Sequence, residues 1–86
     1  MPTISSFHGM LIQMFYRDHL PPHFHVKYGE FKAVIDIQKL APLEGGLPRR
    51  ALSLVLNWAK LHQSELRTNW QLCQALQSPN PIAPLE

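Results

Sequence analysis

Residues 23–37 read HFHVKYGEFKAVIDI, and this stretch decides the fold. On both sides of Gly29 and Glu30, polar and apolar residues alternate with the period of two that is typical of a β-strand. Glycine at the first central position favours a two-residue type II′ turn. The two halves are therefore predicted to pair as a hairpin and to begin a small antiparallel sheet.

The turn determines which side chains of the hairpin face one another. On one face Lys27 lies opposite Lys32, and His23 lies opposite Asp36. Opposing side chains have Cβ atoms about 5 Å apart, so the register predicts a His23–Asp36 contact that orients the imidazole. The other face is apolar and carries the pairs Tyr28–Phe31, Val26–Ala33 and Phe24–Ile35.

The segments around the hairpin indicate an α+β domain. Residues 10–16, MLIQMFY, follow Gly9 and predict a further strand, whereas residues 40–46 are expected to be a linker. Residues 49–62 and 65–76 have apolar side chains at helical spacing. Two helices with a break near Gln63 and Ser64 are expected, and one long kinked helix over residues 48–77 is the alternative.

The expected architecture is an antiparallel sheet of three or four strands packed against two C-terminal helices. These elements form a single domain over residues 1–77. Residues 78–86 contain three prolines and are predicted to be a Pro-rich disordered tail.

Composition narrows the function classes. The chain has 86 residues, a formal net charge of +2 and no clustered run of basic residues, which argues against nucleic-acid binding driven by bulk charge. A single cysteine, Cys73, excludes an intrachain disulfide and is typical of a reducing cytoplasm. No secretory signal or membrane span is expected.

Three of the five histidines fall within the segment Asp18-His19-Leu20-Pro21-Pro22-His23-Phe24-His25. The leading interpretation is a hydrogen-bonding network that holds this loop on the sheet. Metal binding is an alternative, with His19, His23 and His25 as ligands and Asp18 or Asp36 as the carboxylate. Such ligands suit Zn²⁺, Ni²⁺ or Fe²⁺.

Acid–base catalysis without a metal is a further alternative for the same cluster. Two of His19, His23 and His25 can act as general base and general acid, and Arg17 can face a phosphate. This combination predicts a ribonuclease. The residue types leave open whether the chain is an enzyme.

The outer face of the sheet is a candidate binding surface. Leu11, Phe15 and Val34 are expected to share it with His25. An apolar patch beside charged residues often marks an association surface. It predicts either a protein partner or self-association as a homo-oligomer.

Several ordered motifs resemble the small bacterial family called domain of unknown function 4160. They are DHLPPHFH at residues 18–25, YGE at 28–30, AVIDI at 33–37, LPRRA at 47–51, WA at 58–59 and NW at 69–70. The resemblance implies a cytoplasmic protein encoded beside a second small protein, in an arrangement similar to a toxin–antitoxin pair. The expected function is therefore a protein-binding or regulatory component of such a pair. The alternative is a ribonuclease or metal-dependent hydrolase. The resemblance implies no established catalytic residues.

Overall fold

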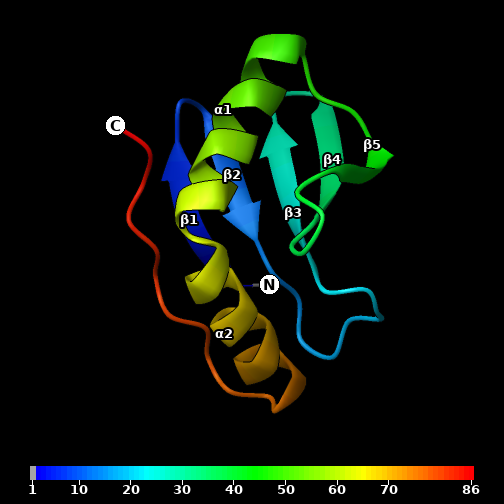
Figure 1. Cartoon of the computed structure of the whole chain (residues 1–86), viewed down its shortest axis with the longest axis vertical. Helices are drawn as coiled ribbons and strands as arrows, with labels where there is room; N and C mark the ends of the chain where they lie inside the picture. The colour runs from blue at the N-terminus through cyan, green and yellow to red at the C-terminus, as the bar shows by residue number, and fades with distance from the viewer. Residues whose placement is uncertain (1) are drawn as a thin grey trace.

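The computed structural model describes residues 2–86 and contains one five-stranded antiparallel sheet. The strands are β1 (Thr3–Phe7), β2 (Met10–Gln13), β3 (His23–Tyr28), β4 (Phe31–Asp36) and β5 (Pro42–Gly45). Each strand pairs with the next in the sequence, and the helices α1 (Arg49–Leu61) and α2 (Gln63–Gln74) follow. Helix α1 crosses one face of the sheet, and α2 continues beyond its lower end (Figure 1). The predicted α+β class is confirmed.

The sheet has five strands rather than the three or four expected. The segment expected to be a linker contains β5, all four residues of which are exposed. A strand with no buried side has no apolar alternation, so residues 42–45 carry no period-two pattern. The predicted strand over residues 10–16 is shorter than expected, because the chain leaves the sheet after Gln13.

The predicted hairpin and its register are confirmed. All five pairs given above occur between β3 and β4, including His23 with Asp36, and His25 lies opposite Val34 in the same register. Gly29 has a φ of +56° and Glu30 has no positive φ, which is the combination that a type II′ turn requires. A shift by one residue would have turned every side chain to the opposite face, so the turn determines which residues enter the core.

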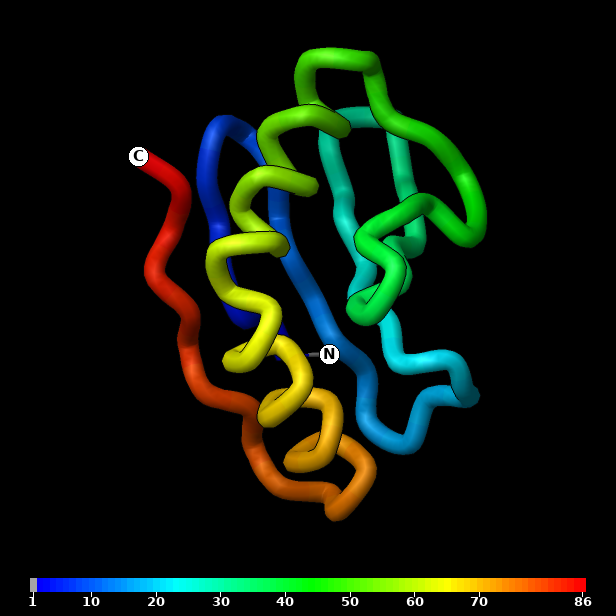
Figure 2. The backbone as a smooth tube through the Cα atoms, in the orientation of Figure 1, coloured from blue at the N-terminus to red at the C-terminus, as the bar shows by residue number. Residues whose placement is uncertain are grey.

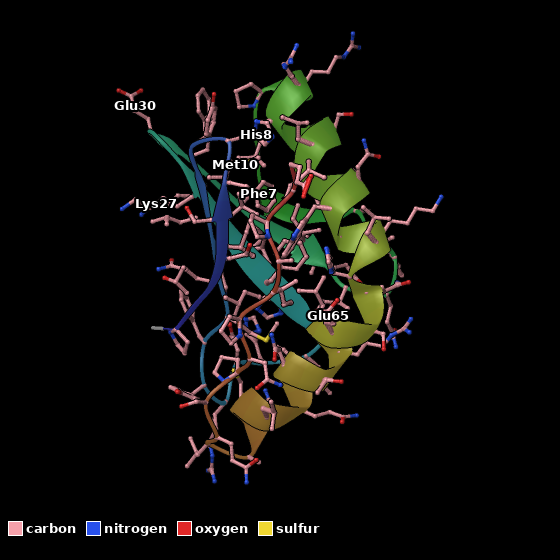
Figure 3. All side chains as sticks on the ribbon, turned by 90° about the vertical axis from the view of Figure 1, so that its left-hand side faces the viewer. Phe7, His8, Met10, Lys27, Glu30 and Glu65 are labelled. Carbon is pink, nitrogen blue, oxygen red and sulfur yellow. The ribbon has the colours of Figure 1, made fainter. Side chains whose placement is uncertain are left out.

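The core lies between the sheet and the helices. Trp58 of α1 is fully buried and contacts the rings of Phe7 and Phe24, at centroid distances of 5.1 and 5.9 Å. Figure 3 shows Phe7 and Met10 on the side of the sheet that faces α1, and Lys27 on the far side. The buried positions of α1 follow the helical spacing predicted: Ala51, Val55, Trp58 and Ala59.

The two helices are separate, as expected, but the boundary differs slightly. The break is at His62, whose φ of −116° and ψ of 23° are not helical, and no side chain caps the start of α2. Leu76, the last residue of the helix expected over residues 65–76, is 58% exposed. It has a φ of +59° and ends the helix in the left-handed conformation.

The expected disordered tail is instead extended and packed against the domain. It runs back along the outside of β1 (Figure 2). The N–H of Ile82 donates to the carbonyl oxygen of Ile4 at 2.8 Å, and Ile82 is buried. The indole N–H of Trp58 donates to the carbonyl oxygen of Ala83 at 2.9 Å. The prolines prevent a helix here, but they are compatible with an extended backbone that packs against the domain.

Cys73 is buried in α2, and burial raises the pKa of its thiol. Within residues 2–86, neither helix has the length and apolar character needed to cross a bilayer.

Candidate functional site

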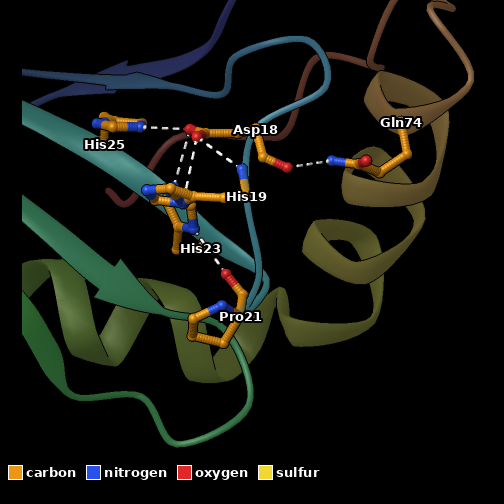
Figure 4. A network of polar contacts seen from close by, with 6 residues as sticks. All are labelled: Asp18, His19, Pro21, His23, His25 and Gln74. Atoms are coloured by element: carbon orange, nitrogen blue, oxygen red, sulfur yellow. Dashed lines mark hydrogen bonds and ion pairs between the residues drawn. The ribbon is translucent and has the colours of Figure 1, made fainter.

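The carboxylate of Asp18 is the centre of the histidine cluster (Figure 4). Its Oδ2 lies 2.9 Å from Nε2 of His23 and 3.1 Å from Nε2 of His25. Its Oδ1 accepts a hydrogen bond from the backbone N–H of His19 at 2.9 Å. One carboxylate therefore joins the loop between β2 and β3 to two side chains of β3.

A backbone carbonyl group determines which ring nitrogen of His23 carries a hydrogen. Its Nδ1 lies 2.6 Å from the carbonyl oxygen of Pro21. A carbonyl oxygen only accepts, so Nδ1 must carry a hydrogen and donate it. If the ring is neutral, Nε2 carries no hydrogen, and its lone pair faces the carboxylate of Asp18 and repels it. A proton on Nε2, or a metal cation between Nε2 and Oδ2 of Asp18, removes this repulsion.

The three side chains are held from several elements. His23 is only 2% exposed, and its ring lies 5.3 Å from that of Trp70 in α2. The ring of His25 stacks on Phe15 with the centroids 4.0 Å apart. The amide of Gln74 in α2 donates to the backbone carbonyl oxygen of Asp18 at 2.9 Å. The positions of all three groups are therefore set by tertiary packing as well as by the loop.

Two opposing effects act on the pKa of Asp18. Burial of the carboxyl by itself raises its pKa. Hydrogen bonds from His25, from the backbone N–H of His19 and from His23, together with the charge on His23, outweigh burial and lower the pKa below its ordinary value of 3.8. Asp18 is therefore a carboxylate at neutral pH.

The structure brings together some of the predicted ligands but not all. His23 and His25 converge, whereas the side chain of His19 is 83% exposed and only its Nδ1 approaches Asp18, at 3.5 Å from Oδ1. The expected contact between His23 and Asp36 does not form, although the backbone register is as predicted. Oδ1 of Asp36 instead accepts the N–H groups of Gln38 and Lys39, at 2.8 and 2.9 Å.

Asp18 takes the place that the register assigned to Asp36. An aspartate at the end of a strand followed by a turn readily caps the backbone beyond it, and this competes with a cross-strand contact. Asp18 is one of the two carboxylates that the sequence offers as a partner for the histidines. Nothing in the sequence pointed to Trp70 or Gln74, which lie about 50 residues further along the chain.

Arg17 lies apart from the cluster. Its side chain is exposed and lines neither of the cavities beside the histidines. The backbone of Arg17 forms part of the turn between β2 and β3, with a φ of +51°. Its N–H donates a hydrogen bond to the carbonyl oxygen of Cys73. Arg17 therefore lies outside the hollows that the imidazoles line, and its contact with a phosphate stays a prediction.

A groove runs along the outer face of the sheet and ends at the cluster. One part has a volume of about 480 Å³ and the part beside Asp18 about 430 Å³. The two parts adjoin each other, because they have four lining residues in common: Phe15, His25, Val34 and Glu44. We call these two adjoining hollows together the outer groove.

The candidate partner-binding residues Leu11, Phe15 and Val34 all line the outer groove with His25. Their shared face was predicted from alternation, and the structure places them together. At the far end from the cluster, Lys27 and Lys32 lie opposite each other on β3 and β4. Neither ammonium group forms an ion pair with a carboxylate of residues 2–86.

Comparison with known proteins identifies a family but no activity. The sequence profile of the family described as Domain of unknown function (DUF4160) matches residues 9–71. The match spans β2 to α2 and includes Asp18, His23 and His25. No curated protein and no solved structure matches the chain.

Proposed function

The chain belongs to the family Domain of unknown function (DUF4160), and we propose that it is the protein-binding, regulatory component of a toxin–antitoxin-like gene pair in the cytoplasm. The observation that carries the proposal is the outer groove. Its floor includes Leu11, which is 38% exposed, together with Phe15 and Val34. An open groove with an apolar floor and charged ends suits a segment of another protein.

The charges of the groove suggest the chemistry of that segment. Lys27 and Lys32 repel each other across the strands, and an acidic side chain between them would relieve the repulsion. The proposed occupant is therefore an extended segment of the neighbouring-gene product with apolar side chains and an acidic residue. Apolar contacts would supply affinity, and the lysines would orient the segment.

Co-expression with the neighbouring gene tests the proposal. The wild-type chain is expected to co-purify with its neighbour, and Leu11→Glu to lose the complex because it places a charge on the apolar floor. The double variant Lys27→Glu/Lys32→Glu is expected to weaken the complex as well. Leu61→Glu is the matched control, because Leu61 is 72% exposed and lies on α1 outside the groove.

Size-exclusion chromatography with light scattering distinguishes the outcomes. A wild-type complex that Leu11→Glu abolishes and Leu61→Glu preserves supports the proposal. Absence of a complex with the wild-type chain contradicts it. A homo-oligomer that Leu11→Glu dissociates would replace it with self-association through the same surface.

A second candidate function is a ribonuclease or metal-dependent hydrolase. It is favoured by the convergence of two imidazoles and a carboxylate at one end of a groove, where they can exchange protons with a bound substrate. In this case the chain expressed alone would be toxic or would degrade RNA. His25→Gln would abolish both effects while the protein stayed folded, and unchanged effects in that variant would exclude the cluster as their cause.

A further inference from the structure

We infer that Asp18, His23 and His25 form a binding site for one divalent ion of the first transition row, of the class of Zn²⁺, Fe²⁺ or Ni²⁺. Each of the three residues offers one ligand atom, and these atoms lie within 4.8 Å of one another. The proposed ligand atoms are Oδ2 of Asp18 and Nε2 of each histidine, which are the atoms that face one another. The inference goes beyond the proposed function, because an isolated chain can bind an ion whether or not a protein partner exists.

Two of the three distances between the ligand atoms match those around a common metal ion. With metal–ligand distances of about 2.1 Å, adjacent ligand atoms lie about 3.0 Å apart around an octahedral ion and about 3.4 Å apart around a tetrahedral ion. The distances from Oδ2 of Asp18 to the two Nε2 atoms are 2.9 and 3.1 Å. Only a small outward movement is needed to admit an ion between them.

The second nitrogen of His23 supports the same conclusion. Metal-binding histidines usually donate the N–H of their other ring nitrogen to a carbonyl or carboxylate, which fixes the tautomer and aims the lone pair at the ion. The Nδ1–H of His23 donates to the carbonyl oxygen of Pro21, so the Nε2 lone pair points at the proposed site. A metal ion between Nε2 of His23 and Oδ2 of Asp18 would take the place of the proton that otherwise separates the lone pair from the carboxylate.

The site is both rigid and reachable. His23 is buried, and the stack on Phe15 restrains His25, so little conformational entropy remains to be lost on binding. The side chains of Asp18 and His25 are 18% and 25% exposed and open into the outer groove. Three protein ligands facing a groove leave further coordination positions for water or a substrate.

The donor set indicates the kind of ion. Two imidazoles and one carboxylate favour transition metals over Ca²⁺ and Mg²⁺, which prefer oxygen ligands throughout. Glu44 and the exposed His19 line the same part of the groove. They are available to contact a metal-bound water, but they are not among the proposed ligands.

Zn²⁺ and Co²⁺ are the probes of the test, with the untagged full-length chain. Isothermal titration is expected to give one Zn²⁺ per chain, and Co²⁺ to give visible d–d absorption. Asp18→Asn and His25→Gln are each expected to weaken Zn²⁺ binding at least about tenfold. His62→Gln is the matched control, because His62 also contacts a carboxylate, Glu65, but lies outside the cluster. It is expected to bind as the wild-type chain does.

A second measurement uses only the wild-type chain and therefore does not depend on whether the variants fold. In the NMR spectrum of the wild-type chain, Co²⁺ is expected to shift or broaden the signals of His23 and His25 before that of His62. Absence of binding, a binding constant unchanged in both Asp18→Asn and His25→Gln, or first effects at His62 would overturn the inference. Because no partner is present, these results are independent of the co-expression outcome.

Discussion

The Nδ1 of His23 lies 2.6 Å from the carbonyl oxygen of Pro21, two residues earlier in the chain. This contact sets the tautomer of a buried imidazole and aims its other nitrogen at Asp18. The loop between β2 and β3 thus provides both the group that orients His23 and the carboxylate that His23 faces. Two measurements below test these contacts, and two more test the approach of β5 to β4 and the packing of the C-terminal segment.

Asp18→Asn is expected to destabilise the protein at neutral pH by about 1–3 kcal/mol, because hydrogen bonds to a charged carboxylate are lost. The folded state lowers the pKa of Asp18, so the carboxylate stabilises the fold above the ordinary value of 3.8. This stabilisation disappears as the pH falls through the folded-state pKa. Urea unfolding at pH 7, 5, 3.5 and 2.5 should show a gap between wild type and variant that narrows only below about pH 4, where the unfolded state begins to bind a proton at this carboxyl.

The control for this pH series is Glu65→Gln. Glu65 is an exposed carboxylate that contacts His62 at 2.6 Å within one helical turn, and surface pairs of this kind contribute about 0–1 kcal/mol. A gap for Asp18→Asn that stayed constant down to pH 2.5 would show that its carboxylate charge does not stabilise the fold.

A double-mutant cycle should couple His23 to Asp18 and not to Asp36. His23→Leu combined with Asp18→Asn is expected to give an interaction energy of about 0.5–3 kcal/mol, as is typical of groups in contact. His23→Leu combined with Asp36→Asn should be nearly additive, because Asp36 bonds to the backbone of Gln38 and Lys39. The measurement is the free energy of unfolding in urea. Coupling to Asp36 as large as that to Asp18 would restore the contact expected from the hairpin register.

Gly45→Ala is expected to destabilise the fold by about 2 kcal/mol or more. Gly45 has a φ of +69°, and a Cβ there would lie 2.1 Å from the carbonyl oxygen of Lys32. The adjacent Gly46 is the matched control, since a Cβ there meets no atom within 4 Å, and Gly46→Ala should stay within about 0.5 kcal/mol of wild type. Thermal unfolding compares the two, and equal melting temperatures would mean that β5 does not approach β4 this closely.

Ile82→Ala is expected to lower the free energy of unfolding by about 2–4 kcal/mol, because it truncates the side chain with which the C-terminal segment packs into the core. Ser78→Ala, at an exposed position of the same segment, should change stability by less than about 0.5 kcal/mol. Chemical denaturation measures both. An Ile82→Ala variant as stable as Ser78→Ala would support the disordered tail expected from the prolines.

Local patterns accounted for much of the sheet and part of the site. Alternation around Gly29 and Glu30 was enough for the hairpin register, and hence for placing His23 and His25 on one face. Such alternation could not predict β5, because β5 buries no side chain. It also could not predict the packing of Ile82, which depends on contacts with β1. The pairing of Lys27 with Lys32 was equally local, and the structure confirms it.

The sequence by itself determined the hairpin, the helical spacing and the presence of a histidine cluster, since turn chemistry and periodicity act between residues near in the chain. Only the tertiary structure decided that Asp18, and not Asp36, faces the imidazoles. That choice depends on the loop being tied to Gln74 and on His23 being covered by Trp70, both in α2. Contacts over such sequence distances form only when helix and sheet pack together, and no local pattern encodes them.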